Sequence, residues 1–264
     1  MEQTLRFLWD REPHLESAEI VLVAHDKCPD IETPFTTNRI DLKLDTYRKP
    51  LMCNVGVDNC KYDDVVLLDS DRILPPHYFY NTWKMLRPGM IISARRLYQL
   101  TRDHSDEQIE HNRIKARKDY RANPFRFGSK NLFSGNTFIK KHDYIKIGWM
   151  DEQFYGHGYA DNDMTITALR NGLTPHYVDA KEFHLFHNVG YMDGDYMISE
   201  ADRKVITGIN IYKLCKKHNL KVNKHTTKYI NEAGVLLSAA SVKYANEFIA
   251  MSHSMPGILE MSHI

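Results

Sequence analysis

Asp64-Val-Val-Leu-Leu-Asp69-Ser70-Asp71 is the stretch of sequence that decides the fold. Four consecutive apolar residues between acidic ends predict a short strand that is covered on both faces. Pro75-Pro76 follows closely and ends any regular element. Two carboxylates directly after a buried strand are costly to place at a sheet edge unless they meet a cation, so the same stretch predicts a site for a divalent ion.

Strand-like and helix-like segments alternate on both sides of this stretch. The predicted strands are 19–24, 39–44, 89–94, 135–140 and 176–178, and the predicted helices are 5–9, 50–60, 142–147 and 162–171. This alternation indicates an α/β fold whose mostly parallel sheet is flanked by helices. Such sheets bind ligands beyond the carboxyl ends of their strands, which is where Asp69 and Asp71 fall. The polar segment 101–130 is expected to form a helix and a mobile surface loop.

The composition is that of an ordinary enzyme-sized domain. The 264 residues carry a formal net charge of +1, which predicts no global attraction to nucleic acid. No apolar run reaches the roughly 18 residues that a membrane span needs, and the charged N-terminus lacks the core of a secretory signal. Membrane association through the apolar residues 248–251 could occur, but nothing indicates it. The four cysteines form no CxxC pair, which favours reduced thiols and a cytoplasmic location.

A second motif, Gly156-His157-Gly158-Tyr159-Ala160-Asp161-Asn162-Asp163, leads into the predicted helix 162–171. Its two glycines permit a close backbone approach to a ligand. Asp161 or Asp163 can serve as the helix N-cap, a role that one Asp satisfies alone. The other carboxylate is then available as a general base that deprotonates a substrate hydroxyl.

The third motif is His184-Leu-Phe-His187. Its spacing puts both imidazoles on one face of a helix or turn, whereas on a strand they would point to opposite sides. Two metal ligands and two unrelated histidines are both compatible with the spacing. An imidazole ligand would favour a transition ion such as Mn²⁺ over Mg²⁺. For Asp69 and Asp71, a helix cap or a solvated turn is the alternative to metal binding.

The order and spacing of these motifs resemble those of GT-A fold glycosyltransferases. Residues 50–76, from Pro-Leu-Met-Cys-Asn-Val-Gly to Asp-Ser-Asp-Arg-Ile-Leu-Pro-Pro, resemble the donor-binding half of that fold. Residues 134–163, from Ser-Gly-Asn to Tyr-Gly-His-Gly-Tyr-Ala-Asp-Asn-Asp, are similar to the acceptor-side motif of the β-1,4-galactosyltransferase group. Chondroitin-polymerase-like members of glycosyltransferase family 2 have similar motifs. The resemblance covers roughly residues 15–190.

The resemblance implies a metal-dependent, inverting transfer of a galactose- or N-acetylhexosamine-type sugar from a UDP-sugar to an acceptor hydroxyl, expected to belong to a glycan. Asp161 would be the general base. The implied ligands of Mn²⁺ or Mg²⁺ are Asp71, His187, Asp69 and His184. The residues implied to bind the donor or line the sugars are Asp69, Ser70, Asp71, Gly135, Trp149, Tyr155, Gly156 and His157. The implied domains are a catalytic domain over 1–198, with a donor half at about 1–100 and an acceptor half at about 130–198, and a helical extension over 199–264.

Two departures from the family pattern keep other readings open. Relatives usually have an acidic residue where this chain has Ala160, and the first strand of the fold is apparently missing, unless the apolar run 233–240 replaces it. The main alternative is therefore a non-catalytic carbohydrate-binding or scaffold descendant of such an enzyme. A nucleotidyltransferase is a further alternative, but that class would need a glycine-rich phosphate loop near the start, and none is visible.

Overall fold

The structure is a computed structural model that describes residues 1–12, 15, 17–32, 35–44, 47–100, 107–109, 120–124, 135–156, 158–185 and 200–220. The helices are α1 (Glu2–Arg11), α2 (Lys49–Asp58), α3 (Tyr78–Met85), α5 (Lys141–Lys146), α6 (Ala160–Arg170) and α7 (Glu200–His218). The strands are β1 (Glu19–Ala24), β2 (Thr36–Asp41), β3 (Asp64–Leu68), β4 (Arg72–Ile73), β5 (Met90–Leu100), β6 (Tyr120–Pro124), β7 (Asn136–Lys140) and β8 (Thr174–His184).

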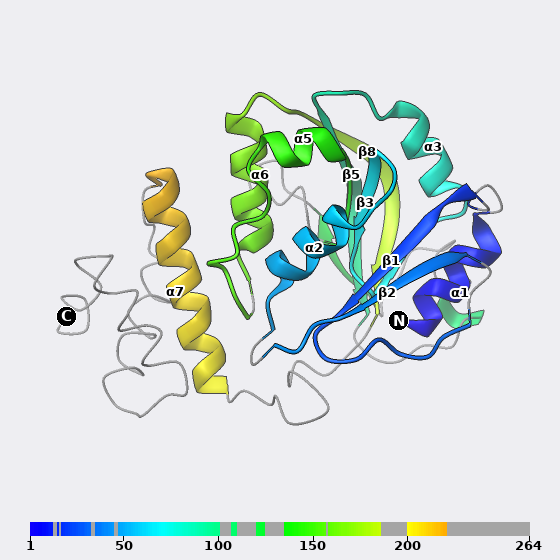
Figure 1. Cartoon of the computed structure of the whole chain (residues 1–264), viewed down its shortest axis with the longest axis horizontal. Coiled ribbons are helices and arrows are strands. Elements are labelled where there is room, and N and C mark those ends of the chain that lie inside the picture. Colours follow the sequence, from blue (N-terminus) through cyan, green and yellow to red (C-terminus); the bar gives the residue numbers. More distant parts are fainter. Residues whose placement is uncertain are drawn as a thin grey trace.

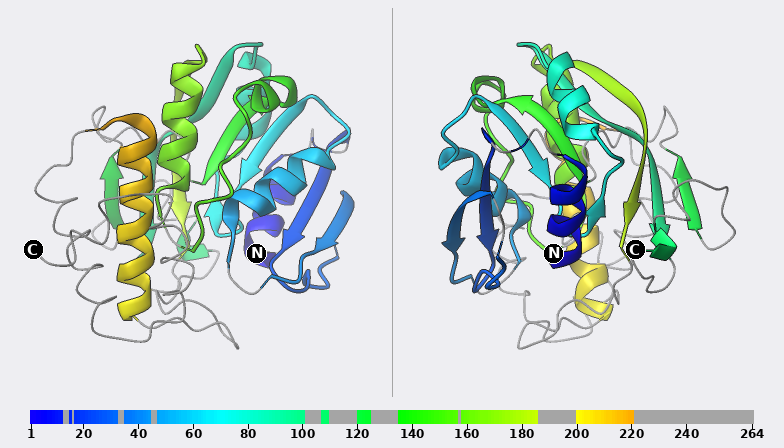
Figure 2. Two further views of the ribbon diagram at one scale, coloured as in Figure 1. Left: turned by 60° about the vertical axis from the view of Figure 1, so that its left-hand side comes forward. Right: turned by 90° about the vertical axis from the view of Figure 1, so that its right-hand side faces the viewer.

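The strands form two sheets. β1 and β2 make a parallel pair, and the larger sheet has the strand order β3-β7-β5-β8-β4, with β6 paired to β5. Helix α2 packs against both sheets, because Gly56 lies against Val23 of β1 while Val57 joins Val65 of β3 in one hydrophobic cluster (Figure 2). The two sheets therefore share a covering helix.

The prediction of a mostly parallel sheet is wrong for the larger sheet. β5 and β8 are parallel, but β7 is antiparallel to both β3 and β5, and β4 and β6 are antiparallel to their neighbours. The reason is where the chain re-enters the sheet. β5 runs to Leu100, and β7 begins at Asn136 opposite Leu68, the last residue of β3. A strand that enters at the carboxyl edge of its neighbour must run back along it.

Helices cover both faces of the larger sheet (Figure 1). Alternate residues of each strand face opposite sides. On one face Ile91 and Ile139 pack with α2, α5 and α6, and on the other Ile92 and Phe138 pack with α3 and, more peripherally, α1. Helix α7 lies outside α6, so it is separated from the sheet by one layer (Figure 1).

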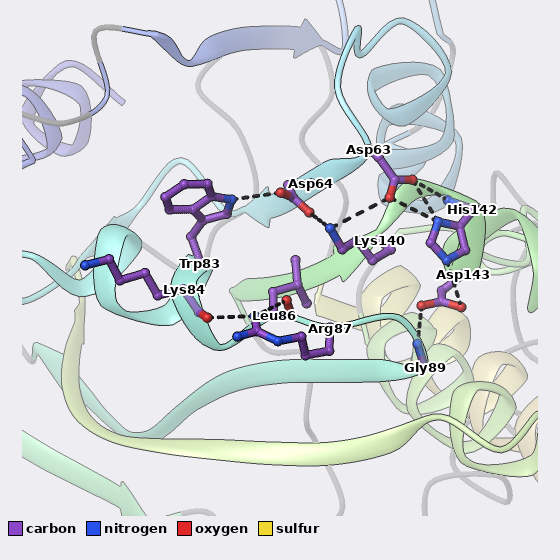
Figure 3. A network of polar contacts seen from close by, with 10 residues as sticks. All are labelled: Asp63, Asp64, Trp83, Lys84, Leu86, Arg87, Gly89, Lys140, His142 and Asp143. Carbon is purple, nitrogen blue, oxygen red and sulfur yellow. Dashed lines mark hydrogen bonds and ion pairs between the residues drawn. The ribbon is translucent and has the colours of Figure 1, made fainter.

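A polar network fastens the edge of the sheet at which β3 begins (Figure 3). The carboxylate of Asp63 contacts Nδ1 of His142 at 3.0 Å and lies 3.9 Å from Nζ of Lys140, which also contacts Asp64. Asp143 in turn accepts a hydrogen bond of 2.6 Å from the backbone N–H of Gly89, just before β5. These contacts tie β3, α5 and β5 together at the edge away from Asp69.

Most predicted elements are confirmed, with shifted ends. The strand 19–24 and the helix 50–60 match β1 and α2 closely, whereas β5 and β8 are longer than expected and α3 was not predicted. Of the polar segment 101–130, the described parts are three helical residues and β6. All four cysteines are free thiols. Among the described residues, no helix is long and apolar enough to cross a membrane.

Candidate functional site

Lys49 joins the predicted metal-binding motif to the predicted general base. Its Nζ lies 2.8 Å from Oδ1 of Asp69 and 3.0 Å from Oδ1 of Asp161. Asp69 directly follows β3, whereas Asp161 lies in the first turn of α6. A cation at the N-terminus of a helix, where Lys49 begins α2, is unfavourable by itself. The two carboxylates offset that cost. Through Lys49, Asp69 and Asp161, which are far apart in the sequence, lie close together.

Burial and charge together set the protonation of this group. Burial disfavours the charged ammonium, but the carboxylates of Asp161 and Asp69 outweigh it and hold the pKa of Lys49 well above its ordinary value. Burial also raises the pKa of Asp161, in the same direction as the nearby charge of Asp69 and against the opposing charge of Lys49. Lys49 is therefore a permanent cation beside a carboxylate whose pKa is raised.

Arg72 of β4 lies between the two carboxylates of the Asp-Ser-Asp turn. Its side chain is only 5% exposed, and its guanidinium is 3.7 Å from Asp69 and 3.5 Å from Asp71. These distances are those of ion pairs rather than of good hydrogen bonds. Within the described part of the chain, Arg72 Nε and Nη1 have no hydrogen-bond partner. The buried guanidinium is thus held beside the two carboxylates by charge rather than by well-formed hydrogen bonds.

Gly135 provides the space for this guanidinium. A Cβ atom at Gly135 would lie 2.1 Å from Nε of Arg72, and the backbone φ of +100° is in the region that favours glycine. The carbonyl of Gly135 also accepts a 2.7 Å hydrogen bond from the backbone N–H of Asp69. Gly135, predicted to line the sugar, thus supports the charged motif directly.

A buried polar chain lies behind Arg72. Glu182 of β8 is 0% exposed, lies 3.9 Å from Arg72 and accepts a hydrogen bond from Asn136 Nδ2. The hydroxyl of Tyr78 donates to Asn136 Oδ1 at 2.7 Å. Burial raises the pKa of Glu182 to about 8, despite the opposing effects of Arg72 and Asn136. Near neutral pH this carboxyl is therefore largely protonated, and it adds little negative charge to the site.

His184, at the end of β8, lies beside Asp71. Its Nδ1 is 2.8 Å from the carbonyl oxygen of Leu185, which can only accept, so Nδ1 donates the hydrogen bond. Nε2 faces Asp71 Oδ2 at 3.3 Å, and in a neutral imidazole this nitrogen presents a lone pair. A nitrogen and a carboxylate oxygen that face each other favour a shared cation, and a carbonyl on the other ring nitrogen is a usual arrangement for a metal-ligating imidazole.

The fit to a metal is thus partial. Among the described residues, no three His, Cys, Asp or Glu side chains are placed to enclose a metal ion. Asp71 and His184 provide two donors, while Asp69 is engaged by Lys49. His187, the other predicted ligand, lies outside the described residues.

Helix α1 supports the Asp-Ser-Asp turn through one hydrogen bond. The Thr4 hydroxyl donates a 2.7 Å hydrogen bond to the carbonyl of Ser70, so the backbone of Ser70 anchors the turn to α1. Glu12, just after α1, is buried and accepts the backbone N–H groups of Phe79 at 2.8 Å and Tyr80 at 3.4 Å, at the start of α3. A carboxylate at a helix N-terminus satisfies donors that would otherwise lack partners. Glu12 therefore connects the end of α1 to the start of α3.

The two acidic residues at the start of α6 have separate partners. Asp161 faces Lys49, whereas Asp163 is buried against His218 Nε2 at 2.7 Å and Lys217 Nζ at 2.9 Å. Neither carboxylate caps the helix, since the N-cap residue is Tyr159 and no side chain bonds there. The alternative that one Asp is the N-cap is therefore wrong, and the two carboxylates have different partners.

The remaining predicted residues are spread more widely. Trp149 packs edge-on against Tyr144 at 5.4 Å in the core beside α5. Tyr155 is buried under α7, and the N–H of Gly156 donates to the carbonyl of Tyr47 at 2.7 Å. His157 lies outside the described residues. Among the described residues, no contact joins Trp149 to Lys49, Asp69 or Asp161.

Three residues of the site were not predicted from the sequence: Lys49, Arg72 and Glu182. Arg72 directly follows the Asp-Ser-Asp motif, so its position was a usable signal. Lys49 stands one residue before a proline at a helix start, where a cation opposes the helix dipole and thus calls for an explanation. Glu182 interrupts a strand without any local sign that it is buried.

Comparisons with known proteins bear on the fold and on one segment of the chain. Residues 117–188 match the sequence model of a family described as the N-terminal domain of galactosyltransferase. A search of curated proteins found no match. The structure is similar to that of GalNAc-T7, crystallised with UDP, GalNAc and Mn²⁺, with a TM-score of 0.56 at 11% identity over 96% of this chain and 54% of that one. This chain thus spans about half the length of the GalNAc-T7 chain.

A weaker similarity links the chain to S. aureus TarS residues 1–349 in complex with UDP-GlcNAc. The TM-score is 0.48 at 12% identity, over 99% of this chain and 83% of that one. The similarity to GalNAc-T7 establishes the GT-A fold, and the family match covers the segment that contains Asp161 and His184. The chain therefore has the GT-A fold, and its residues 117–188 resemble the N-terminal domain of galactosyltransferase.

The contact of Gly135 with Arg72 can be tested against a matched glycine. Gly172, after α6, has a similar φ of +83°, but an added Cβ there would meet no described atom within 4 Å. Gly135→Ala is expected to lower the free energy of unfolding by about 1–3 kcal/mol more than Gly172→Ala, because only the former overpacks a buried group. Urea denaturation with comparison of the midpoints provides the measurement. Equal losses in both variants would show that Arg72 does not depend on Gly135.

Proposed function

We propose that the protein is a glycosyltransferase that transfers a sugar from a UDP-sugar to a hydroxyl of a glycan acceptor. The observation that carries the proposal is the convergence of Asp69 and Asp161 on Lys49, with Asp71 and Arg72 beside them, at the carboxyl end of β3. This is the edge at which an α/β sheet binds its ligands. The GT-A fold and the family match at residues 117–188 support the same reaction class.

The donor is proposed to be a UDP-sugar of the galactose or N-acetylhexosamine type. GalNAc-T7, which shares the fold, was crystallised with UDP and GalNAc, and the matched family is one of galactosyltransferases. The guanidinium of Arg72 places a positive charge beside the Asp-Ser-Asp turn, and this charge would attract a diphosphate. Because the acidic side chains near Arg72 would repel a diphosphate, a further cation is expected to bind with the donor.

That cation is proposed to be Mn²⁺, or Mg²⁺, held by Asp71 and His184, with support from Asp69 and with His187 as a further ligand. The imidazole facing Asp71 favours Mn²⁺ over Mg²⁺. When bound, the ion stabilises the negative charge that develops on the departing nucleoside diphosphate.

Asp161 is proposed to be the general base of an inverting single displacement. Its carboxylate takes the proton of the acceptor hydroxyl while that oxygen forms a bond to the anomeric carbon. The bond from the anomeric carbon to the diphosphate breaks, and the nucleoside diphosphate leaves. Burial raises the pKa of Asp161, which makes the carboxylate a stronger base than an exposed Asp. The nearby charge of Lys49 opposes that rise and so favours the ionised form of Asp161.

The base assignment predicts the effect of Asp161→Asn. The change keeps the shape but removes the proton acceptor, so kcat for sugar transfer should fall by about 10²–10⁴-fold. The affinity for UDP, measured by calorimetry with Mn²⁺, should change little because the donor contacts lie on the Asp71 side. Turnover at the wild-type level would refute the assignment. Absence of transfer in the wild-type protein with every UDP-sugar tested would favour the non-catalytic alternative.

The metal assignment predicts a loss of Mn²⁺-dependent UDP binding. Asp71→Ala and His184→Ala should each weaken this binding at least about tenfold in calorimetric titrations, since each removes a proposed ligand. His187→Ala should have the same effect. His142→Ala is a matched control, because His142 pairs with Asp63 at the opposite edge of the sheet (Figure 3). If Asp71→Ala and His184→Ala both bind UDP with unchanged Mn²⁺ dependence, the metal site is wrong.

A further inference from the structure

Helix α7 contacts the backbone that leads into α6. We call residues 153–156 and 158–159 the lead-in segment. Asn210 of α7 is 0% exposed, and its Nδ2 donates to the carbonyls of Tyr155 at 2.9 Å and Gly158 at 3.1 Å. One amide group thus holds two carbonyls that are three residues apart.

The lead-in segment needs such support because its own backbone is unfavourable. Gly156, Gly158 and Tyr159 all have positive φ, at 62°, 88° and 71°. A left-handed conformation is unfavourable for a residue with a side chain, such as Tyr159. The N-terminus of α6 also has no side-chain cap that could fix its start. Contacts from outside must therefore select this conformation.

Two further residues of α7 pack on the same segment. A Cβ atom at Gly156 would lie 2.9 Å from Cγ2 of Ile206, so the backbone and the helix are in close contact. Lys213 Nζ donates to the carbonyl of Gln153 and lies 4.9 Å from the centre of the Tyr155 ring. The contacts of α7 with the segment are thus polar, apolar and cation–π in kind.

The end of α7 holds α6 itself. His218 and Lys217 bind Asp163, and Arg170 at the other end of α6 donates a 2.6 Å hydrogen bond to the carbonyl of His218. Figure 1 and the left-hand view of Figure 2 show α7 alongside α6. The lead-in segment and the first turn of α6 are therefore held by one helix, and Asp161 lies in that turn.

We propose that α7 positions the general base, with Asn210 as the positioning residue. The Asn210 amide fixes the carbonyls of Tyr155 and Gly158, these fix the left-handed turn before α6, and the turn sets where Asp161 points relative to Lys49. The assignment rests on the proposed function, because it gives α7 a role in transfer. It also makes α7 an integral part of the catalytic domain.

Asn210→Asp tests this role, because it keeps the shape of the side chain but turns a carboxylate toward two carbonyls. Hydrogen exchange of the backbone amides in residues 153–160 should become at least about tenfold faster. The kcat for transfer should fall on the order of 10- to 100-fold, because a misplaced catalytic group loses that much. The KM for the UDP-sugar and the affinity for UDP with Mn²⁺ should stay within about twofold, given that the donor contacts are elsewhere.

Asn171→Asp is the matched control. Asn171 also donates from its amide to a backbone carbonyl, that of Thr167 at 2.8 Å, but it is exposed after the last turn of α6. Exchange in residues 153–160 and kcat should not change in this variant. If Asn210→Asp fails to fold, Lys213→Met replaces it, because the apolar stem is kept while the bond to Gln153 is lost. Faster exchange in residues 153–160 and a lower kcat, with unchanged KM and UDP affinity, are then expected again, but each change should be smaller.

The possible outcomes separate this proposal from the proposed function. In Asn210→Asp, faster exchange of residues 153–160 with an unchanged kcat would show that Asn210 does not position the base. Unchanged exchange of these residues would show that Asn210 of α7 does not hold the lead-in segment. A wild-type protein that transfers no sugar would overturn the proposed function and the positioning of a base with it. In that case exchange in Asn210→Asp still decides whether α7 holds the segment.

Discussion

The ion pairs of Lys49 with Asp69 and Asp161 are the interaction on which the organisation of the site depends. Asp69 directly follows a strand in the first half of the chain, and Asp161 lies in the first turn of a helix in the second half. Two carboxylates this close together, largely out of water, would repel each other strongly without a cation between them. Lys49 therefore reduces the repulsion between them, and it fixes the distance between the proposed donor side and the proposed base. The hydrophobic cluster shared by β3, α2 and α6 keeps the three elements at the spacing that this contact requires.

Asp69 and Asp161 are each supported by a separate set of contacts. On the Asp69 side, Arg72 sits over Gly135, Thr4 binds the carbonyl of Ser70, and α1 extends this support to α3. On the Asp161 side, α7 holds the turn before α6 through Asn210 and holds α6 through Asp163. Each side therefore has a helix outside the central layers that stabilises a short stretch of irregular backbone. Irregular segments held by regular elements are common where proteins position reactive groups.

The sequence predicted the fold where a pattern is local. The apolar run of β3 and the β-branched run of β1 were recognised, as was the position of the Asp-Ser-Asp turn at the end of a strand. The antiparallel course of β7 was not, because strand direction depends on where the chain returns after segment 101–134. Lys49 and Glu182 were missed for a similar reason, since the role of Lys49 depends on Asp161, far along the chain, and that of Glu182 on Asn136 and on complete burial. For His184 the motif indicated a ligand, while its partner Asp71 became evident only from the pairing of β8 with β4.

The central claim is that Lys49 stabilises the ionised form of a catalytic Asp161, and the pH dependence of kcat in Lys49→Met tests it most directly. The pKa of Asp161 already lies above its ordinary value, and Lys49 opposes that rise. Without the cation the acid limb of the profile, measured at saturating UDP-sugar, should move to higher pH. Lys61→Met, at an exposed lysine that pairs with Glu19, should leave the limb in place. An unmoved acid limb in Lys49→Met, or one moved to lower pH, would contradict the account.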